Sequence, residues 1–381
     1  MRYESVLADR IRPKLDFLYG EWAATCLEAI LELVRQYRPR LAKRIPRSWY
    51  QRDALLITYA DPIRSPGRTP LAALEEFLRQ SGLQKVLTGI HLLPFFPYSS
   101  DDGFSVIDYR QVDPAVRTWA DMRRLAERYR LVFDQVLNHV SFRSRYFQSY
   151  LAGKEPFVHY FLERQHGADY NRVVRPRTSP LFTPVRTARG VREVWTTFSP
   201  DQINWNSHEP GVLLERLDIF LFYSAQGAQV IRLDAIAYLW KKPGTACIHL
   251  PPTHTLVNLL RDLVEAVCPA VLLLTETNVP HEENVPHFGQ GDEAHLVYLF
   301  SLPPLLLDAL LTEDGTYLAQ WLSDWHKPPP GCMYLVFTAS HDGIEVRALA
   351  RVLPPERTER LIAAVQARRG RVSFRRMGNG S

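Results

Sequence analysis

Short apolar runs alternate with amphipathic segments along most of the chain. Runs of strand length, rich in Leu, Ile, Val and Phe, occupy residues 54–59, 89–93, 131–138, 229–237, 272–276, 294–300 and 333–339. Between them, apolar residues recur at helical spacing from Pro70 onward and over residues 119–129, 211–226, 253–267 and 302–325. Strands that alternate with helices are typical of a parallel α/β sheet with right-handed crossovers.

Two architectures fit such a sheet, a doubly wound sheet and a closed barrel. No G-x-G-x-x-G motif or P-loop opens any of the predicted helices, which disfavours a nucleotide-binding doubly wound sheet. Polar residues instead follow the ends of several different strands, as barrel active sites require. We therefore predict a TIM (β/α)8-type barrel whose last strand is missing or incomplete.

The chain also divides by pattern. Residues 1–50 predict an N-terminal helical cap, with an apolar face formed by Trp22, Leu27, Ile30, Leu31 and Val34. Residues 51–381 then form the barrel. From about residue 140 to 210 the periodicity is lost among aromatic, Pro and Arg residues, and a loop of that length without structure is uncommon. We expect a small inserted subdomain there, after the third strand.

Four of the predicted strands end in polar residues. Arg232 and Asp234 lie two positions apart on one strand, so alternation places them on the same side. Glu276 ends the next strand, 138–139 is Asn-His and 341–342 is His-Asp. An isolated R-x-D is more often a structural salt bridge than a site, and it is the set of four strand ends that favours a site.

This ordered set resembles the four signature regions of the α-amylase family, glycoside hydrolase family 13. The family patterns are D-x-x-x-N-H at 134–139, R-x-D at 232–234, the strand-terminal Glu276 and H-D at 341–342. Residues 92–104, 194–202 and 275–284 further resemble the sucrose-phosphorylase-type subfamily, in particular its glucosylglycerate phosphorylases.

The resemblance implies catalytic roles for three carboxylates. Asp234 corresponds to the nucleophile, Glu276 to the acid/base and Asp342 to the carboxylate that stabilises the transition state. Retention needs the first two carboxyls roughly 5–5.5 Å apart, which neighbouring strand ends permit. Arg232 is expected to keep Asp234 ionised, whereas a less polar surrounding would keep Glu276 protonated.

The resemblance also implies a sugar-binding set. His139, His341 and Asp101 would bind the hydroxyls of a glucosyl ring, and Phe104 would form an apolar platform under it. Phe198 and Gln202 resemble an acceptor-side pair, although plain packing and a loop hydrogen bond explain these two residues equally well.

Together these likenesses imply transfer of glucose from an α-glucoside, glucosylglycerate or sucrose, to inorganic phosphate. A related α-glucoside hydrolase or transglucosidase is the alternative, and a truncated inactive or sugar-binding barrel is another. Glu345 stands where the family has glycine after H-D-G-I, and the family continues through an eighth strand and a C-terminal β domain beyond the position of Ser381.

Composition, charge and motif content argue against several other classes of function. The formal charge of +5 comes with arginines spread along the chain, so nucleic acid is not an expected partner, whereas anionic small substrates are. No signal region and no membrane-spanning run is present, and a cytoplasmic enzyme without a membrane partner is expected. No H-E-x-x-H and no clustered Cys/His motif occurs, so we expect no cofactor and no metal ion.

Overall fold

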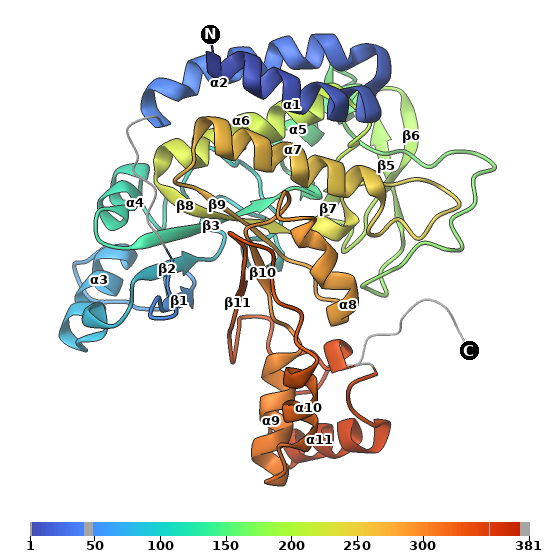
Figure 1. The fold of residues 1–381 in the computed structure, drawn as a ribbon. Helices are drawn as coiled ribbons and strands as arrows, with labels where there is room; N and C mark the ends of the chain where they lie inside the picture. The colour runs from blue at the N-terminus through green and yellow to red at the C-terminus, as the bar shows by residue number, and fades with distance from the viewer. Residues whose placement is uncertain (1, 42–48, 350, 374–381) are drawn as a thin grey trace.

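Seven parallel strands form one sheet in which the spatial order follows the order along the chain. The computed structural model describes residues 2–41, 49–349 and 351–373 (Figure 1). The strands, in sheet order, are β1 (Leu55–Thr58), β2 (Gly89–Leu92), β3 (Arg130–Val136), β8 (Ala228–Asp234), β9 (Leu272–Thr275), β10 (Leu296–Tyr298) and β11 (Met333–Leu335). In a doubly wound sheet the strand order reverses at one point, and no reversal occurs here. The barrel prediction is therefore confirmed.

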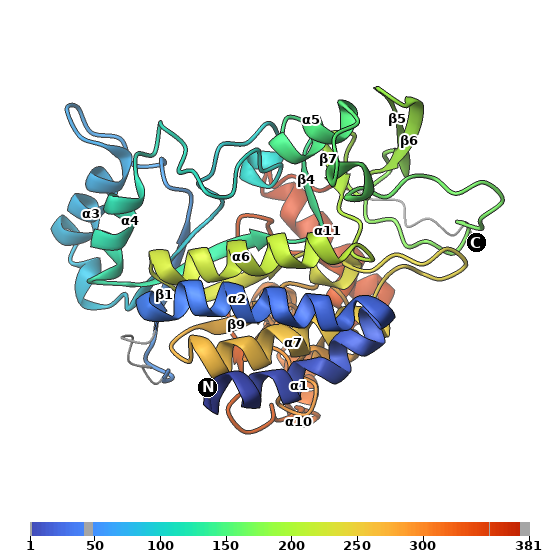
Figure 2. The same ribbon diagram turned by 90° about the horizontal axis from the view of Figure 1, so that it is seen from above.

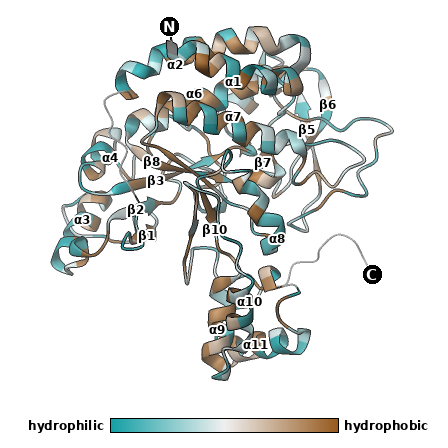
Figure 3. Ribbon diagram, viewed as in Figure 1, coloured by the Kyte–Doolittle hydropathy of each residue, from teal (hydrophilic) through white to brown (hydrophobic). Residues whose placement is uncertain are grey.

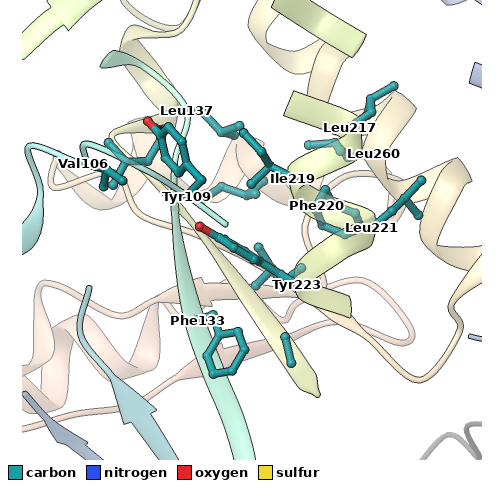
Figure 4. Close-up of a cluster of buried hydrophobic side chains, with 14 of the residues drawn as sticks. Val106, Tyr109, Phe133, Leu137, Leu217, Ile219, Phe220, Leu221, Tyr223 and Leu260 are labelled. Atoms are coloured by element: carbon teal, nitrogen blue, oxygen red, sulfur yellow. Dashed lines mark hydrogen bonds between the residues drawn. The ribbon is translucent and has the colours of Figure 1, made fainter. Parts of the chain in front are cut away.

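The two sides of the sheet bury different sets of apolar residues, as strand alternation requires. On the side of Arg232, one cluster gathers five strand residues: Val132, Val230, Leu274, Leu296 and Tyr298. The other side carries Phe133, Ile231 and Leu233, which belong to the main core. There the side chains of β3 meet those of the helix that precedes β8 (Figure 4). Figure 3 shows hydrophobic residues concentrated in these central strands.

Four long helices cover this outer side of the sheet. They are α6 (Pro210–Gln226), α7 (Pro251–Val267), α1 (Arg2–Tyr19) and α2 (Ala23–Leu41). Figures 1 and 2 show α1 and α2 lying over α6 and α7. Arg10 binds Glu265 at 2.8 Å and Tyr37 donates to Asp218 at 2.7 Å, which fastens α1 to α7 and α2 to α6.

The predicted apolar face of the N-terminal segment is correct except at one residue. Leu27, Ile30, Leu31 and Val34 are buried along α2. Trp22 is 56% exposed, because it lies in the 3-10 turn η1 (Gly20–Trp22) that joins the two helices rather than on the inward face of either.

Two helices pack beside β1 to β3. Helix α3 (Pro70–Gln80) begins as predicted, with the amide of Ala72 donating to the hydroxyl of Thr69 at 3.2 Å. The turn η2 (Leu83–Lys85) follows it, and α4 (Trp119–Ala126) starts at a second threonine cap, Thr118. Such side-chain caps satisfy amide groups that a helix leaves free at its first turn.

Residues 139–204 contain short elements of their own. Strands β4 (His139–Ser141) and β7 (Gln202–Asn204) pair antiparallel, and β5 (Phe182–Thr187) and β6 (Gly190–Trp195) form a hairpin. Helix α5 (Arg145–Leu151) and η4 (Phe157–His159) lie between them in sequence. Because β4 directly follows β3, this segment starts at the end of the sheet where the polar strand ends lie.

The segment after β9 leaves the sheet and returns to it twice. It forms α8 (His281–Asn284) and η6 (Val285–Phe288) before β10, then α9 (Leu302–Thr312) and α10 (Thr316–Ser323) before β11. The helical stretch predicted over 302–325 is thus two helices, because Glu313, with φ of 55°, ends α9.

The last described helices stand apart from the sheet. After β11, residues 336–349 and 351–373 form η7 (Arg347–Leu349) and α11 (Pro355–Ala367) but no strand. Both pack with α9 around a separate cluster that includes Leu305, Leu349 and Leu361 (Figure 1). No helix in the described residues has the length and apolar character needed to cross a bilayer.

Candidate active site

One buried arginine joins the ends of three neighbouring strands. The Nη1 of Arg232 donates to Asp134 at 2.5 Å and to Asp234 at 2.7 Å. Its Nη2 lies 4.0 Å from Oε2 of Glu276, the residue that follows β9. These residues come from β3, β8 and the end of β9, and the predicted placement of Arg232 and Asp234 on one side is confirmed.

The backbone after Asp234 binds the neighbouring carboxylate directly. The amide of Ala235 donates to Oε2 of Glu276 at 3.0 Å. Ala235 has φ of 50°, a left-handed conformation that a residue with a Cβ adopts at a cost of about 1–3 kcal/mol. The chain thus turns sharply after Asp234, and this turn positions Glu276 beside it.

Burial decides the charge of this cluster as much as Arg232 does. Burial raises the pKa of Asp234 well above its ordinary value, and it raises the pKa of Glu276 as well. Burial opposes ionisation of Asp134 too, but His91 and Arg232 outweigh it and lower that pKa to about 2. Arg232 lowers the pKa of Asp234, as expected, but burial opposes this effect and outweighs it. One guanidinium faces three carboxyl groups, and it favours the charged form most where it is in contact, at Asp234 rather than at Glu276.

A polar network lies next to this cluster, at the start of β4 and β7. The Nε2 of His139 is 3.0 Å from the carbonyl oxygen of Phe104 and 3.1 Å from the amide nitrogen of Gln202. The same side-chain amide nitrogen, Nε2 of Gln202, donates to Asp101 at 2.8 Å. Burial lowers the pKa of His139 to about 4, so the ring is neutral at pH 7. The ring of Phe198 packs against it with a centroid distance of 5.3 Å.

The loop that carries Asp101 and Phe104 is tied to the inserted segment. Asp201, next to Gln202, accepts hydrogen bonds from Ser100 at 2.5 Å and from Ser105 at 2.8 Å. Within the loop, η3 (Asp101–Gly103) ends at Gly103 with φ of 106°, and a Cβ there would lie 2.7 Å from a carbonyl oxygen. A glycine is required at this turn.

The residues that follow β11 contact the loop that carries Phe104. The ring of His341 stacks on Phe104, with centroids 5.4 Å apart and planes inclined by 8°. Asp342 lies 3.4 Å from Nε2 of His341. Its side chain is 54% exposed, against 11% for Asp234 and 15% for Glu276. Asp342 is near enough for its charge to contribute to the raised pKa of Glu276.

The ten predicted site residues therefore gather around one end of the sheet, and the structure adds others. His91, buried on β2, contacts Asp134 at 2.8 Å. The sequence analysis did not single out His91, although a lone histidine within an apolar strand could have indicated it. Glu345 lines a small pocket with Asp342 and Phe300, and its charge also helps to raise the pKa of Glu276. No spacing rule pointed to Tyr298, whose ring lies 6.0 Å from the guanidinium of Arg232.

Comparison with known proteins places this arrangement in a family. The profile of the alpha amylase catalytic domain matches residues 82–347. The glucosylglycerate phosphorylase of Spirochaeta thermophila is 49% identical over 98% of this chain, and that of Escherichia coli is 40% identical over 98%. The chain spans 64% and 67% of the lengths of these two relatives.

A solved structure agrees with the sequence relatives. The crystal structure of sucrose 6F-phosphate phosphorylase from Thermoanaerobacter thermosaccharolyticum superimposes with a TM-score of 0.75 and 26% identity. The match covers 86% of this chain and 67% of that one. The strand-end carboxylates, the profile match and these relatives lead to one conclusion: the chain belongs to the α-amylase family.

Proposed function

We propose that this protein is a retaining α-glucosyl phosphorylase, which transfers glucose from an α-glucoside to inorganic phosphate and releases α-glucose 1-phosphate. The observation that carries the proposal is the contact of Arg232 with Asp234 at 2.7 Å and its approach to Glu276 at 4.0 Å. Two carboxyl groups on neighbouring strands, sharing one cation, form the pair that glycosyl transfer with retention needs.

In the first half of the reaction, the ionised Asp234 attacks the anomeric carbon and forms a glucosyl ester. Glu276 gives its proton to the leaving oxygen, and burial suits it to this task because it raises the pKa of the acid. Arg232 then remains beside the carboxylate that has reacted and orients its free oxygen.

In the second half, phosphate takes the place of the departed alcohol. Glu276, now ionised, accepts a proton from phosphate as a phosphate oxygen attacks the anomeric carbon. The bond from that carbon to Asp234 breaks, so two inversions give net retention. Positive charge develops on the sugar in the transition states of both half-reactions, and the carboxylate of Asp342 would stabilise it.

The polar network next to the pair provides a place for the glucosyl ring. Asp101, His139 and His341 offer hydrogen-bonding atoms, and Phe104, with the ring of His341 stacked on it, offers apolar surface. Phe198 and Gln202 both contact His139 and would meet the acceptor. We propose glucosylglycerate as the donor, with sucrose second, because relatives that are 49% and 40% identical carry the first name and one that is 32% identical carries the second.

The test incubates the purified chain with glucosylglycerate or sucrose, with and without phosphate, and measures α-glucose 1-phosphate and free glucose. We expect phosphate-dependent glucose 1-phosphate, faster from glucosylglycerate, and none with Asp234→Asn. Free glucose at the same rate without phosphate would identify a hydrolase instead. Thermal stabilisation by glucose without turnover would identify a sugar-binding barrel and overturn the proposal.

A further inference from the structure

Three histidines come together outside the carboxylate site. His249 follows the turn η5 (Ile236–Tyr238) after β8, His254 lies in the first turns of α7, and His287 lies in η6 after β9. One nitrogen from each ring lies within 4.8 Å of the others. His249 and His287 are 38 positions apart, so no metal-binding spacing in the sequence pointed to them.

The distances between the rings suit a small cation. Nδ1 of His249 and Nε2 of His287 are 3.3 Å apart. Two imidazole nitrogens bound tetrahedrally to zinc, each at about 2.0–2.1 Å, are separated by about 3.3 Å. The ring of His254 stacks on that of His287 with centroids 4.8 Å apart, which places a third imidazole beside the first two.

A carboxylate holds the outer nitrogen of one of these rings. Nδ1 of His254 lies 2.9 Å from Oε2 of Glu293, which fixes the proton there and leaves the lone pair on Nε2. Nε2 of His249 lies 3.7 Å from Oε2 of Glu283, too far for a hydrogen bond, and is buried without a hydrogen-bond partner among the described residues. A carboxylate on the far nitrogen is the usual partner of a metal-binding histidine.

The third ring is buried without full hydrogen bonding. His287 has no exposed surface, and its Nδ1 lacks a hydrogen-bond partner among the described residues. The side chains of His249 and His254 are 19% and 23% exposed, which gives an ion a path in.

We propose that His249, His254 and His287 bind one divalent transition-metal ion, of which zinc is the expected physiological one. Three imidazoles favour zinc, cobalt, nickel or copper over calcium or magnesium, which prefer oxygen ligands. The site would join the loop after the strand of Asp234 to the segment after the strand of Glu276. Its role is structural, because it fastens two loops that both border the carboxylate pair.

The test titrates Zn²⁺ into the EDTA-treated full chain by calorimetry and measures zinc content after dialysis. We expect one zinc per chain. His254→Gln and His249→Gln should each lower the affinity by at least about 100-fold, and Glu293→Gln by about 10–100-fold, because outer partners contribute less than ligands. The exposed His166→Gln is the matched control and should bind as the wild type does.

Cobalt provides a second measurement that needs no variant. Co²⁺ bound by three imidazoles in a tetrahedral site gives intense visible absorption, which Zn²⁺ should abolish by competition. Thermal melting should rise with Zn²⁺ in the wild type and in His166→Gln but not in His254→Gln. The proposal is overturned if the wild type takes up no zinc, if cobalt shows only weak octahedral bands, or if His249→Gln and His254→Gln bind zinc as tightly as His166→Gln.

Discussion

Arg232 and Asp234 are two positions apart on β8, and their side chains meet at 2.7 Å at the end of the strand. The same guanidinium holds Asp134 on the adjacent strand at 2.5 Å. Both contacts are buried, so neither carboxylate has water to replace its partner. The four predictions below test what this cluster does.

Asp234→Asn should abolish glucosyl transfer while leaving the fold intact. The amide keeps the shape of the side chain but cannot attack the anomeric carbon. We expect a loss of about 10⁴-fold or more in kcat, as for other removed nucleophiles. Release of glucose 1-phosphate measures the rate, and circular dichroism checks the fold. A rate near that of the wild type would remove Asp234 from the mechanism.

Glu276→Gln should be sensitive to the leaving group. With glucosylglycerate the departing oxygen needs a proton, so the glutamine variant should be slow. With α-glucosyl fluoride, whose leaving group needs little protonation, the first half of the reaction should recover substantially. The ratio of the two rates in variant and wild type is the measurement. Equal losses with both donors would contradict the acid role.

Glu345→Gln should change the pH dependence of the reaction. Activity falls as pH rises through the pKa of Glu276, because only its protonated form can act as the acid. Burial raises that pKa, and the charges of Asp342 and Glu345 raise it further. Removing one charge lowers the pKa, so the alkaline limb of kcat/KM should shift to lower pH.

The matched control for that shift is Glu356→Gln, which removes an exposed charge at the start of α11. Its pH profile should coincide with that of the wild type. A profile of Glu345→Gln that stays in place or moves to higher pH would show that Glu345 does not act on the pKa of Glu276.

Arg232→Met should destabilise the fold strongly. It leaves two buried carboxyl groups, Asp134 and Asp234, without their cation, and breaking a buried pair from one side costs about 3–5 kcal/mol. Urea unfolding measures the loss. Adding Asp134→Asn should restore part of it, since one uncompensated charge is then removed. The exposed Arg143→Met should stay within about 0.5 kcal/mol of the wild type.

Much of the fold follows from local pattern. Each of the seven apolar runs corresponds to a strand, although every strand is shorter than its run and β10 and β11 have only three residues each. Alternation placed Arg232 and Asp234 on one side because successive residues of a strand face opposite ways. In a parallel sheet the strands end at one edge, so Asp234, Glu276 and His139 were expected to gather there. These relationships depend on sequence neighbours and on strand direction, both of which the sequence determines.

What only the tertiary structure decided depends on burial and on contacts between distant segments. Trp22 has the spacing of a buried residue, yet the turn between two helices exposes it. Arg232 beside Asp234 suggested an ionised carboxylate, but the depth of the site raises its pKa because water is excluded. His249 and His287 meet only because two strands bring their following loops together. No local pattern records such a meeting, since it arises from the packing of the whole chain.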